Sequence, residues 1–326
     1  MVEEATTGMI IKPPYAELEN LDKLSIAFQL QDHLYGFDAD GTNYFLKRLN
    51  KYAESQDIKY QIGYHNVLEH HIHSLYPNLD IKLFSDWQNR LNLDKFLQYT
   101  QHPEVNYKNF ICSFNGTEHV SRKLLVAILE KFNYFSIEHC SKNIAFSVNT
   151  LDGHIQDLVG DQHSFYRKFF ISDHSEKFFQ SINSFGHVQQ QHDKNIYNLE
   201  SKITQSFLHV VSESMATSHV PFVTEKFLYS VVTRGLFLTY AQPGWHTHVE
   251  KYYGFKLYDK LFDYRFDAIQ NPVERLVELM SMISKFSILT ADEWMDLYHL
   301  EQDTIEYNYD HYFSGAYIRH LKTYEN

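Results

Sequence analysis

Cysteine and basic residues are scarce in this sequence of 326 residues, and each shortage excludes a class of protein. The two cysteines, Cys112 and Cys140, are too few for a disulfide framework and lack the spacing of a metal site, which favours a reducing cytoplasm. Lysine and arginine number 29 against 41 aspartates and glutamates. The net charge of -12 argues against a surface that embraces nucleic acid, because such surfaces carry an excess of basic side chains.

Long hydrophobic runs are also missing. No stretch reaches the roughly 18 apolar residues of a membrane-spanning helix, and residues 1–15 lack a basic segment followed by an apolar one. We therefore expect neither a membrane span nor a secretion signal. Aromatic residues are abundant instead, with 24 Tyr and 25 Phe, and a hydrophobic fraction of 44% indicates a folded globular protein.

The first 105 residues alternate between strand-like and helix-like patterns. The patterns predict strands at 24–30, 57–63 and 80–84, and helices at 42–53 and 67–75. A β-α-β-α-β order favours a parallel sheet with right-handed crossovers. We expect residues 1–105 to form one Rossmann-like lobe.

Residues 106–326 repeat this alternation around a polar stretch. Strands are predicted at 107–114, 206–211, 236–240 and 255–258, and helices at 122–133, 224–233, 247–253 with Gly254 as cap, and from Pro272 onward. Residues 150–200 lack clean periodicity, so we expect an irregular insertion with short helices. The fold class is therefore α/β, with two Rossmann-like domains, 1–105 and 106–326, that face a cleft.

Charged residues gather where the strand at 206–211 ends. Ligands of parallel α/β sheets bind beyond the carboxyl ends of the strands, at helix N-termini that attract phosphate. Glu213 follows this strand, and Thr224, Glu225 and Lys226 begin the next helix. A glutamate there can accept both ribose hydroxyls and a lysine can bind a diphosphate. In the alternative interpretation Thr224 only caps the helix and Glu225 only complements its dipole.

The strand at 107–114 ends in a comparable loop. Asn115 and Gly116 allow the backbone to approach a ligand closely, and Arg122 with Lys123 opens the following helix. An arginine in the first turn of a helix is usually solvated, but its position at a strand-to-helix corner favours phosphate binding.

Two runs of residues carry a family resemblance. Residues 207–214 (FLHVVSES) and 221–227 (PFVTEKF) resemble the Glu-Asn-Ser and Thr-Glu-Lys signature of α-1,3-fucosyltransferases, and look still closer to a group of phage and bacterial glycosyltransferases. As in those proteins, a helix and strand at 228–240 lead to a Gly-Phe-Lys at 254–256 and to a helix start with Asn-Pro and Arg at 271–275.

This resemblance, over about residues 106–285, implies a GT-B fold with a UDP- or GDP-linked sugar as co-substrate on the C-terminal lobe, no further cofactor and no metal. Glu225 would bind the ribose, Lys226 a phosphate, and Arg122 the diphosphate with Lys123 beside it. The asparagine that follows the glutamate in the family signature is replaced here by serine. The role of Glu213 is therefore open.

The N-terminal lobe would hold the acceptor and a catalytic base. Asp38, Asp40 and His33 lie in the loop after the first predicted strand, and a carboxylate or histidine there can take the proton of the attacking hydroxyl. An ordinary turn that leads into a helix capped by Thr42 explains the same residues equally well.

Several alternatives stay open. Asp38-Ala39-Asp40 also matches the Asp-x-Asp motif with which metal-dependent GT-A enzymes hold a divalent ion, although it lies far from the predicted donor strands. A second hypothesis is a catalytically inactive GT-B-like module that binds a nucleotide or a partner protein. The acceptor is a glycan or, in a phage, a modified DNA base, and the oligomeric state is open. His65, His70, His71 and His73, with Glu69 nearby, suggest a metal site, but nothing in the sequence places a further ligand, so we expect a solvated helix there. His246 and His248 follow the second strand of the donor lobe and are expected in a sugar-contacting loop.

Overall fold

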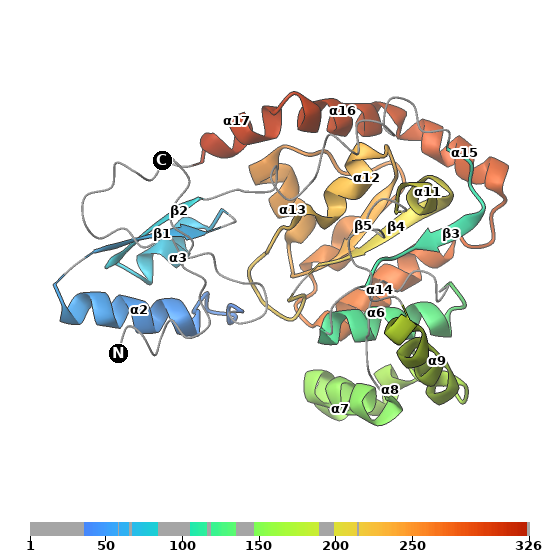
Figure 1. Cartoon of the computed structure of the whole chain (residues 1–326), viewed down its shortest axis with the longest axis horizontal. Helices are drawn as coiled ribbons and strands as arrows, with labels where there is room; N and C mark the ends of the chain where they lie inside the picture. Colours follow the sequence, from blue (N-terminus) through green and yellow to red (C-terminus); the bar gives the residue numbers. More distant parts are fainter. Residues whose placement is uncertain are drawn as a thin grey trace.

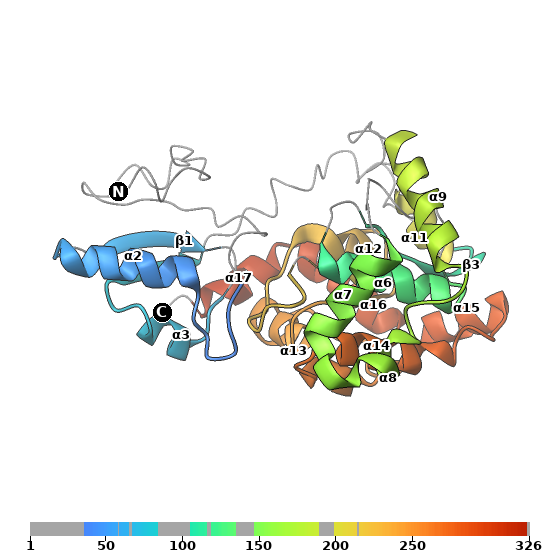
Figure 2. The same ribbon diagram turned by 90° about the horizontal axis from the view of Figure 1, so that it is seen from below.

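The protein has a mixed α/β fold with two parallel sheets. A computed structural model describes residues 36–57, 59–64, 67–83, 105–115, 119–134, 147–188, 199–213 and 215–324. Within them, a two-stranded sheet belongs to a small N-terminal lobe and a three-stranded sheet to a large C-terminal lobe. The lobes lie side by side in both views (Figures 1 and 2). The predicted strand at 24–30 lies outside the described residues.

The small lobe follows the predicted alternation. Its elements are α2 (Tyr44–Ser55), β1 (Tyr60–Tyr64), α3 (His70–Ser74) and β2 (Leu79–Leu83). β1 and β2 pair in parallel, with Tyr60 opposite Leu79. The cap of α2 is Asn43 rather than Thr42, because the Asn43 side chain accepts the Leu46 N–H at 3.0 Å.

The large lobe is built around β3 (Asn109–Cys112), β4 (Ser206–Ser212) and β5 (Phe237–Tyr240), which lie in that order and are all parallel. Every residue of β4 is buried. This burial requires cover on both faces of the sheet, as parallel sheets generally have. Figure 1 shows α6 and α14 on one face and α12, α13, α15 and α16 on the other.

The remaining elements of the large lobe are mostly helical. They are α6 (Val120–Lys131), α7 (Val148–Val159), η3 (Gly160–Gln162), α8 (His163–Arg167), α9 (Ser175–Val188), α11 (Leu199–Thr204), η5 (Glu225–Phe227), α12 (Leu228–Val232), α13 (Trp245–His248), η6 (Val249–Tyr253), η7 (Tyr264–Ala268), α14 (Pro272–Ser284), α15 (Ala291–Leu300), α16 (Gln302–Phe313) and α17 (Ala316–Lys322). None of the described helices combines the length and apolarity needed to cross a bilayer.

Two regions differ from the predicted pattern. Within 150–200, α7 and α9 are regular helices, and Leu151 and Phe179 are buried in the large core, so this stretch adds an outer helical layer. The prediction of a strand at 255–258 is wrong. The Lys256 N–H donates to the Asn308 side chain at 2.8 Å and its carbonyl accepts from that side chain at 3.0 Å, so α16 takes the bonds that a neighbouring strand would need.

A π-helical turn, η6, continues α13. Gly254 ends it with a φ of 74°, as the predicted cap requires. Two histidines of the C-terminal helices bond to its carbonyls: His311 reaches Tyr253 O at 2.8 Å and His320 reaches Lys251 O at 2.9 Å. The helices α16 and α17 therefore fix the end of η6.

The loop 215–223, which follows β4 in sequence, joins the two lobes. Ser218 Oγ accepts the Phe37 N–H at 3.0 Å, and the His219 N–H donates to Phe37 O at 3.0 Å. Val220 and Phe222 are buried in the core of the small lobe. A segment of the C-terminal half thus completes the N-terminal core.

Phe222→Ala should destabilise the small lobe selectively. Removing a buried phenylalanine ring from a core costs about 3 kcal/mol or more. Amide hydrogen exchange should accelerate in β1 and β2 well before β4 is affected. Phe165→Ala is the matched control, because Phe165 is 53% exposed. Equal acceleration in β2 and β4 would contradict the assignment of Phe222 to the small core.

Candidate functional site

A buried carboxylate organises the carboxyl end of β4. Glu213 is fully buried, and its Oε1 accepts the Thr224 N–H at 3.0 Å. Its Oε2 accepts the Thr224 hydroxyl at 2.6 Å and lies 3.4 Å from the Lys226 ammonium. A buried charge is stable only when it is paired and hydrogen-bonded, and Glu213 meets both conditions.

Thr224 and Lys226 are held in place by this carboxylate. The Lys226 Nζ donates to Thr224 Oγ1 at 2.8 Å, and the Lys226 side chain is 22% exposed. Thr224 Oγ1 also accepts the Lys226 N–H at 3.4 Å, which is the bond of a helix cap. Thr224 thus makes contacts that fit both the helix-cap and the ligand-site interpretation. Its shorter bonds go to Glu213 and to the lysine side chain. η5 begins at Glu225, whose side chain lies outside what the structure describes.

The first turn of α6 brings two cations to the neighbouring strand end. Arg122 is 3% exposed and Lys123 is 6% exposed, so neither is the solvated residue that such a position usually carries. Asn115 is fully buried and donates to Ser113 Oγ at 3.0 Å. Gly116 lies outside the described residues.

Three buried oxygens at this sheet edge have no hydrogen-bond partner within the described part of the chain. They are Asn115 Oδ1, Ser121 Oγ and Ser212 Oγ. The β3–β4 register sets Cys112 opposite His209, and its continuation by three residues sets Asn115 opposite Ser212. Because buried polar atoms are almost always paired with protein, water or ligand, these three atoms leave hydrogen-bonding capacity at this edge.

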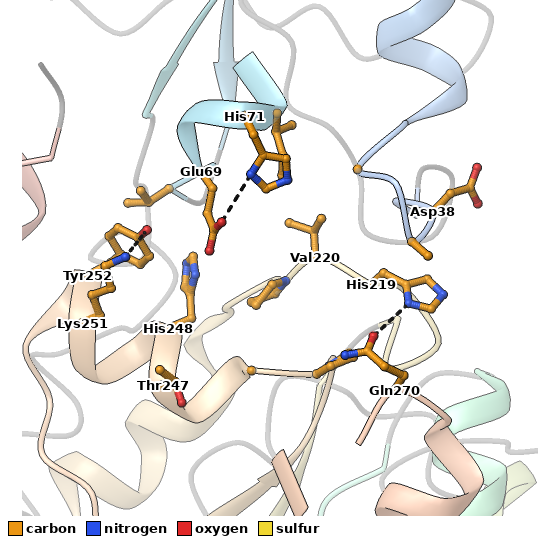
Figure 3. Close-up of a pocket in the computed structure, with 17 residues that line it drawn as sticks. Asp38, Glu69, His71, His219, Val220, Thr247, His248, Lys251, Tyr252 and Gln270 are labelled. Carbon is orange, nitrogen blue, oxygen red and sulfur yellow. Dashed lines mark hydrogen bonds and ion pairs between the residues drawn. The ribbon is translucent and has the colours of Figure 1, made fainter. Parts of the chain in front are cut away.

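A cavity of about 440 Å³ lies between the lobes. Its walls combine the loop after Gly36, the start of α3, the loop 215–223, and the segment from Pro243 through η6 (Figure 3). The lining residues are Asp38, Ala39, Gly41, Val67, Glu69, His71, Ile72, His219, Val220, Pro221, Pro243, Gly244, Thr247, His248, Lys251, Tyr252 and Gln270. Neither the Glu213 cluster nor Arg122 is among them, so the loop 215–223 connects two separate places.

Of the predicted N-terminal residues, Asp38 lines the cavity and Asp40 does not. Asp40 Oδ1 accepts the Thr42 N–H at 2.9 Å and the Thr42 hydroxyl at 2.7 Å. These bonds, the side-chain one above all, lower the pKa of Asp40 and give it the turn role of the alternative interpretation. His33 lies outside the described residues.

Sequence reasoning missed the role of α3. Glu69 and His71 were expected on a solvated helix, but both line the cavity, and His71 Nδ1 lies 3.3 Å from a Glu69 carboxylate oxygen. The signal was available in the sequence: Glu69 follows a predicted strand in a β-α-β unit, and so lies near the carboxyl edge of its sheet.

His248 belongs to the opposite wall. It is 5% exposed, and its Nε2 has no hydrogen-bond partner in the described structure. Figure 3 shows the ring reaching from α13 toward Glu69. Burial, with a smaller effect of Lys251, lowers the pKa of His248 to about 3. The imidazole is therefore uncharged at neutral pH.

His246 has a structural role instead. Its Nε2 accepts the Thr239 N–H at 3.1 Å, so Nδ1 carries the proton and donates to Asp267 at 2.8 Å. Asp267 also accepts the His246 N–H at 3.1 Å. This network joins β5, α13 and η7.

Arg275, the arginine of the 271–275 motif, is buried and bonds to several backbone carbonyls. Its guanidinium donates to Ala216 O at 2.6 Å, Ala241 O at 2.9 Å and Gln270 O at 3.0 Å, and also to Ile269 O. It thereby fixes the loops after β4 and β5 to the start of α14.

Comparison of the chain with protein-family models, curated proteins and solved structures found no match. Within the described residues, no three His, Cys, Asp or Glu side chains are grouped so that they could hold a metal ion.

His248 should make the fold acid-sensitive. In the unfolded chain a histidine takes up a proton near its usual pKa of 6.5, whereas folded His248 resists until about pH 3. Stability is therefore lost as the pH falls through this window, by about 2 kcal/mol at about pH 5. Urea unfolding of wild type and His248→Gln should show a shallower acid loss in the variant, and His299→Gln serves as the control. If the free energies of unfolding of wild type and His248→Gln fell equally with pH, the low pKa assigned to His248 would be wrong.

Proposed function

We propose that this protein is a nucleotide-sugar-dependent glycosyltransferase with a GT-B arrangement of its two lobes. The nucleotide diphosphate binds the large lobe beyond the carboxyl ends of β3 and β4, and the acceptor enters from the small lobe. The observation that carries the proposal is the Glu213–Thr224–Lys226 cluster, because it places a fixed ammonium at the edge of a parallel sheet where phosphate ligands bind.

Further features of the same edge support a diphosphate. Arg122 and Lys123 stand in the first turn of α6, whose N-terminus favours negative charge. The unpartnered Ser121 and Ser212 hydroxyls can donate to phosphate or sugar oxygens. In this assignment Arg122 and Lys226 bind the diphosphate and Glu225 accepts from the ribose hydroxyls.

The transfer step needs a base that faces the acceptor. A carboxylate takes the proton of an acceptor hydroxyl while its oxygen attacks the anomeric carbon, and the bond to the nucleotide diphosphate breaks. Asp38 is the described carboxylate of the predicted set that lines the cavity. Glu69, on the same wall, is a second carboxylate able to serve.

Glu225→Ala should weaken binding of UDP or GDP strongly and leave the fold intact. Charged hydrogen bonds to two ribose hydroxyls contribute roughly 2–4 kcal/mol, so the affinity should fall by about thirtyfold or more. Isothermal calorimetry with each nucleotide measures the effect. Glu278→Ala, on an exposed position of α14, is the matched control. Unchanged affinity in Glu225→Ala would remove the assignment of the ribose site.

Nucleotide binding should survive chelation. The groups assigned to the diphosphate are cationic side chains and hydroxyls, which need no bridging metal. The dissociation constants of UDP and GDP should be equal, within experimental error, with and without EDTA. A large loss of affinity in EDTA would favour the metal-dependent interpretation of Asp38-Ala39-Asp40.

A further inference from the structure

The charges on the cavity walls are unequal. Asp38 and Glu69 contribute two exposed carboxylates from the small lobe. Lys251 is the one lysine or arginine among the described lining residues, and its Nζ donates to the Tyr252 hydroxyl at 2.9 Å. The Glu69 carboxylate also lies 3.3 Å from His71 Nδ1. Two carboxylates against one lysine still disfavour an anionic ligand.

His248 supplies the polar group at the base of the cavity. The imidazole is uncharged, because burial depresses its pKa, and its Nε2 is unpartnered within the described chain. Figure 3 shows the ring aimed into the space between the lobes. A neutral imidazole can donate or accept one hydrogen bond at Nε2, depending on its tautomer, so it suits a hydroxyl group. A free carboxylate or phosphate would be bound better by an arginine or a protonated histidine.

Part of the remaining wall is apolar. Val220, Pro243 and the Tyr252 ring line the cavity beside the polar groups. A volume of about 440 Å³ lies within the range of small-molecule sites. Apolar surfaces beside scattered hydrogen-bonding groups match the face of a sugar ring, which presents C–H groups on one side and hydroxyls at its rim.

We propose that the cavity binds an uncharged, polyhydroxylated ligand, the neutral sugar end of a glycan acceptor, and rejects anionic ligands including DNA. That the sugar is the acceptor of a transfer rests on the proposed function. That the cavity binds a neutral sugar is argued from the cavity alone. Glu69 and Asp38 accept hydrogen bonds from the sugar hydroxyls, and His248 bonds to a hydroxyl deeper in the cavity.

Matched sugars test the proposal. Ligand-observed NMR titrations would use the methyl glycosides of glucose, galactose and mannose, each paired with the corresponding uronic acid, at low ionic strength. At least one neutral glycoside should bind, and its uronic acid should bind about tenfold more weakly. Because each uronic acid carries a carboxylate where the neutral sugar has a hydroxymethyl group on the same ring, the comparison tests the effect of the wall carboxylates.

Variants identify the residues. His248→Phe should weaken the neutral glycoside about tenfold, and His248→Gln, which keeps a hydrogen-bonding group, should weaken it less. His299→Phe, at an exposed position of α15, is the control. Glu69 is exposed, so Glu69→Gln removes one charge without disturbing a core. It should reduce the difference in affinity between the glycoside and its uronic acid. Glu54→Gln, on α2, should leave that difference in affinity unchanged.

Nucleotide titrations on the same samples separate this proposal from the proposed function. Failure of UDP and GDP to bind, with the sugar results as expected, would overturn the glycosyltransferase and leave the cavity assignment standing. Nucleotide binding without any bound glycoside, equal binding of glycoside and uronic acid, or displacement of the glycoside by a twelve-nucleotide DNA strand would each overturn the cavity assignment.

Discussion

The buried carboxylate of Glu213 is the constraint on which both candidate sites depend. It has no exposure to water and is neutralised by Lys226, while Thr224 donates to it twice. These bonds hold together the residues on either side of the loop 215–223. Removal of Thr224 or Lys226 would take hydrogen bonds away from a buried carboxylate, which is strongly destabilising. The same carboxylate therefore positions the cation assigned to phosphate and fixes the loop that reaches the other lobe.

That loop links the two lobes physically. Val220 and Phe222 of this loop are buried in the small core, and His219 and Val220 also line the interlobe cavity. Arg275 holds its first residues through Ala216 O. A ligand that shifts η5 at the sheet edge would act directly on the wall of the cavity. The proposed donor and acceptor sites lie at the two ends of this segment, which would give a physical route for coupling nucleotide binding to the position of the lobes.

Local signals predicted much of the fold and part of the site. β4 and β5 were found because short apolar runs end at polar loops, and α14 because Asn271 and Pro272 form a recognisable helix start. The burial and bonding of Glu213 were not predictable, because they depend on contacts with Thr224 and Lys226, eleven and thirteen residues further along the chain. The same holds for His248, whose neutral state results from burial by distant segments. The predicted strand at 255–258 failed because Asn308, from α16, takes its backbone bonds. Long-range packing decided each of these cases.

Photolabelling with 5-azido-UDP and 8-azido-GDP tests the central claim, that a nucleotide diphosphate binds beyond the carboxyl ends of β3 and β4. Mass spectrometry of the labelled peptides locates the base directly. The account predicts label within 113–123 or 212–227, and loss of that label when unmodified nucleotide is added. Competable label confined to 36–83, in the small lobe, would contradict it.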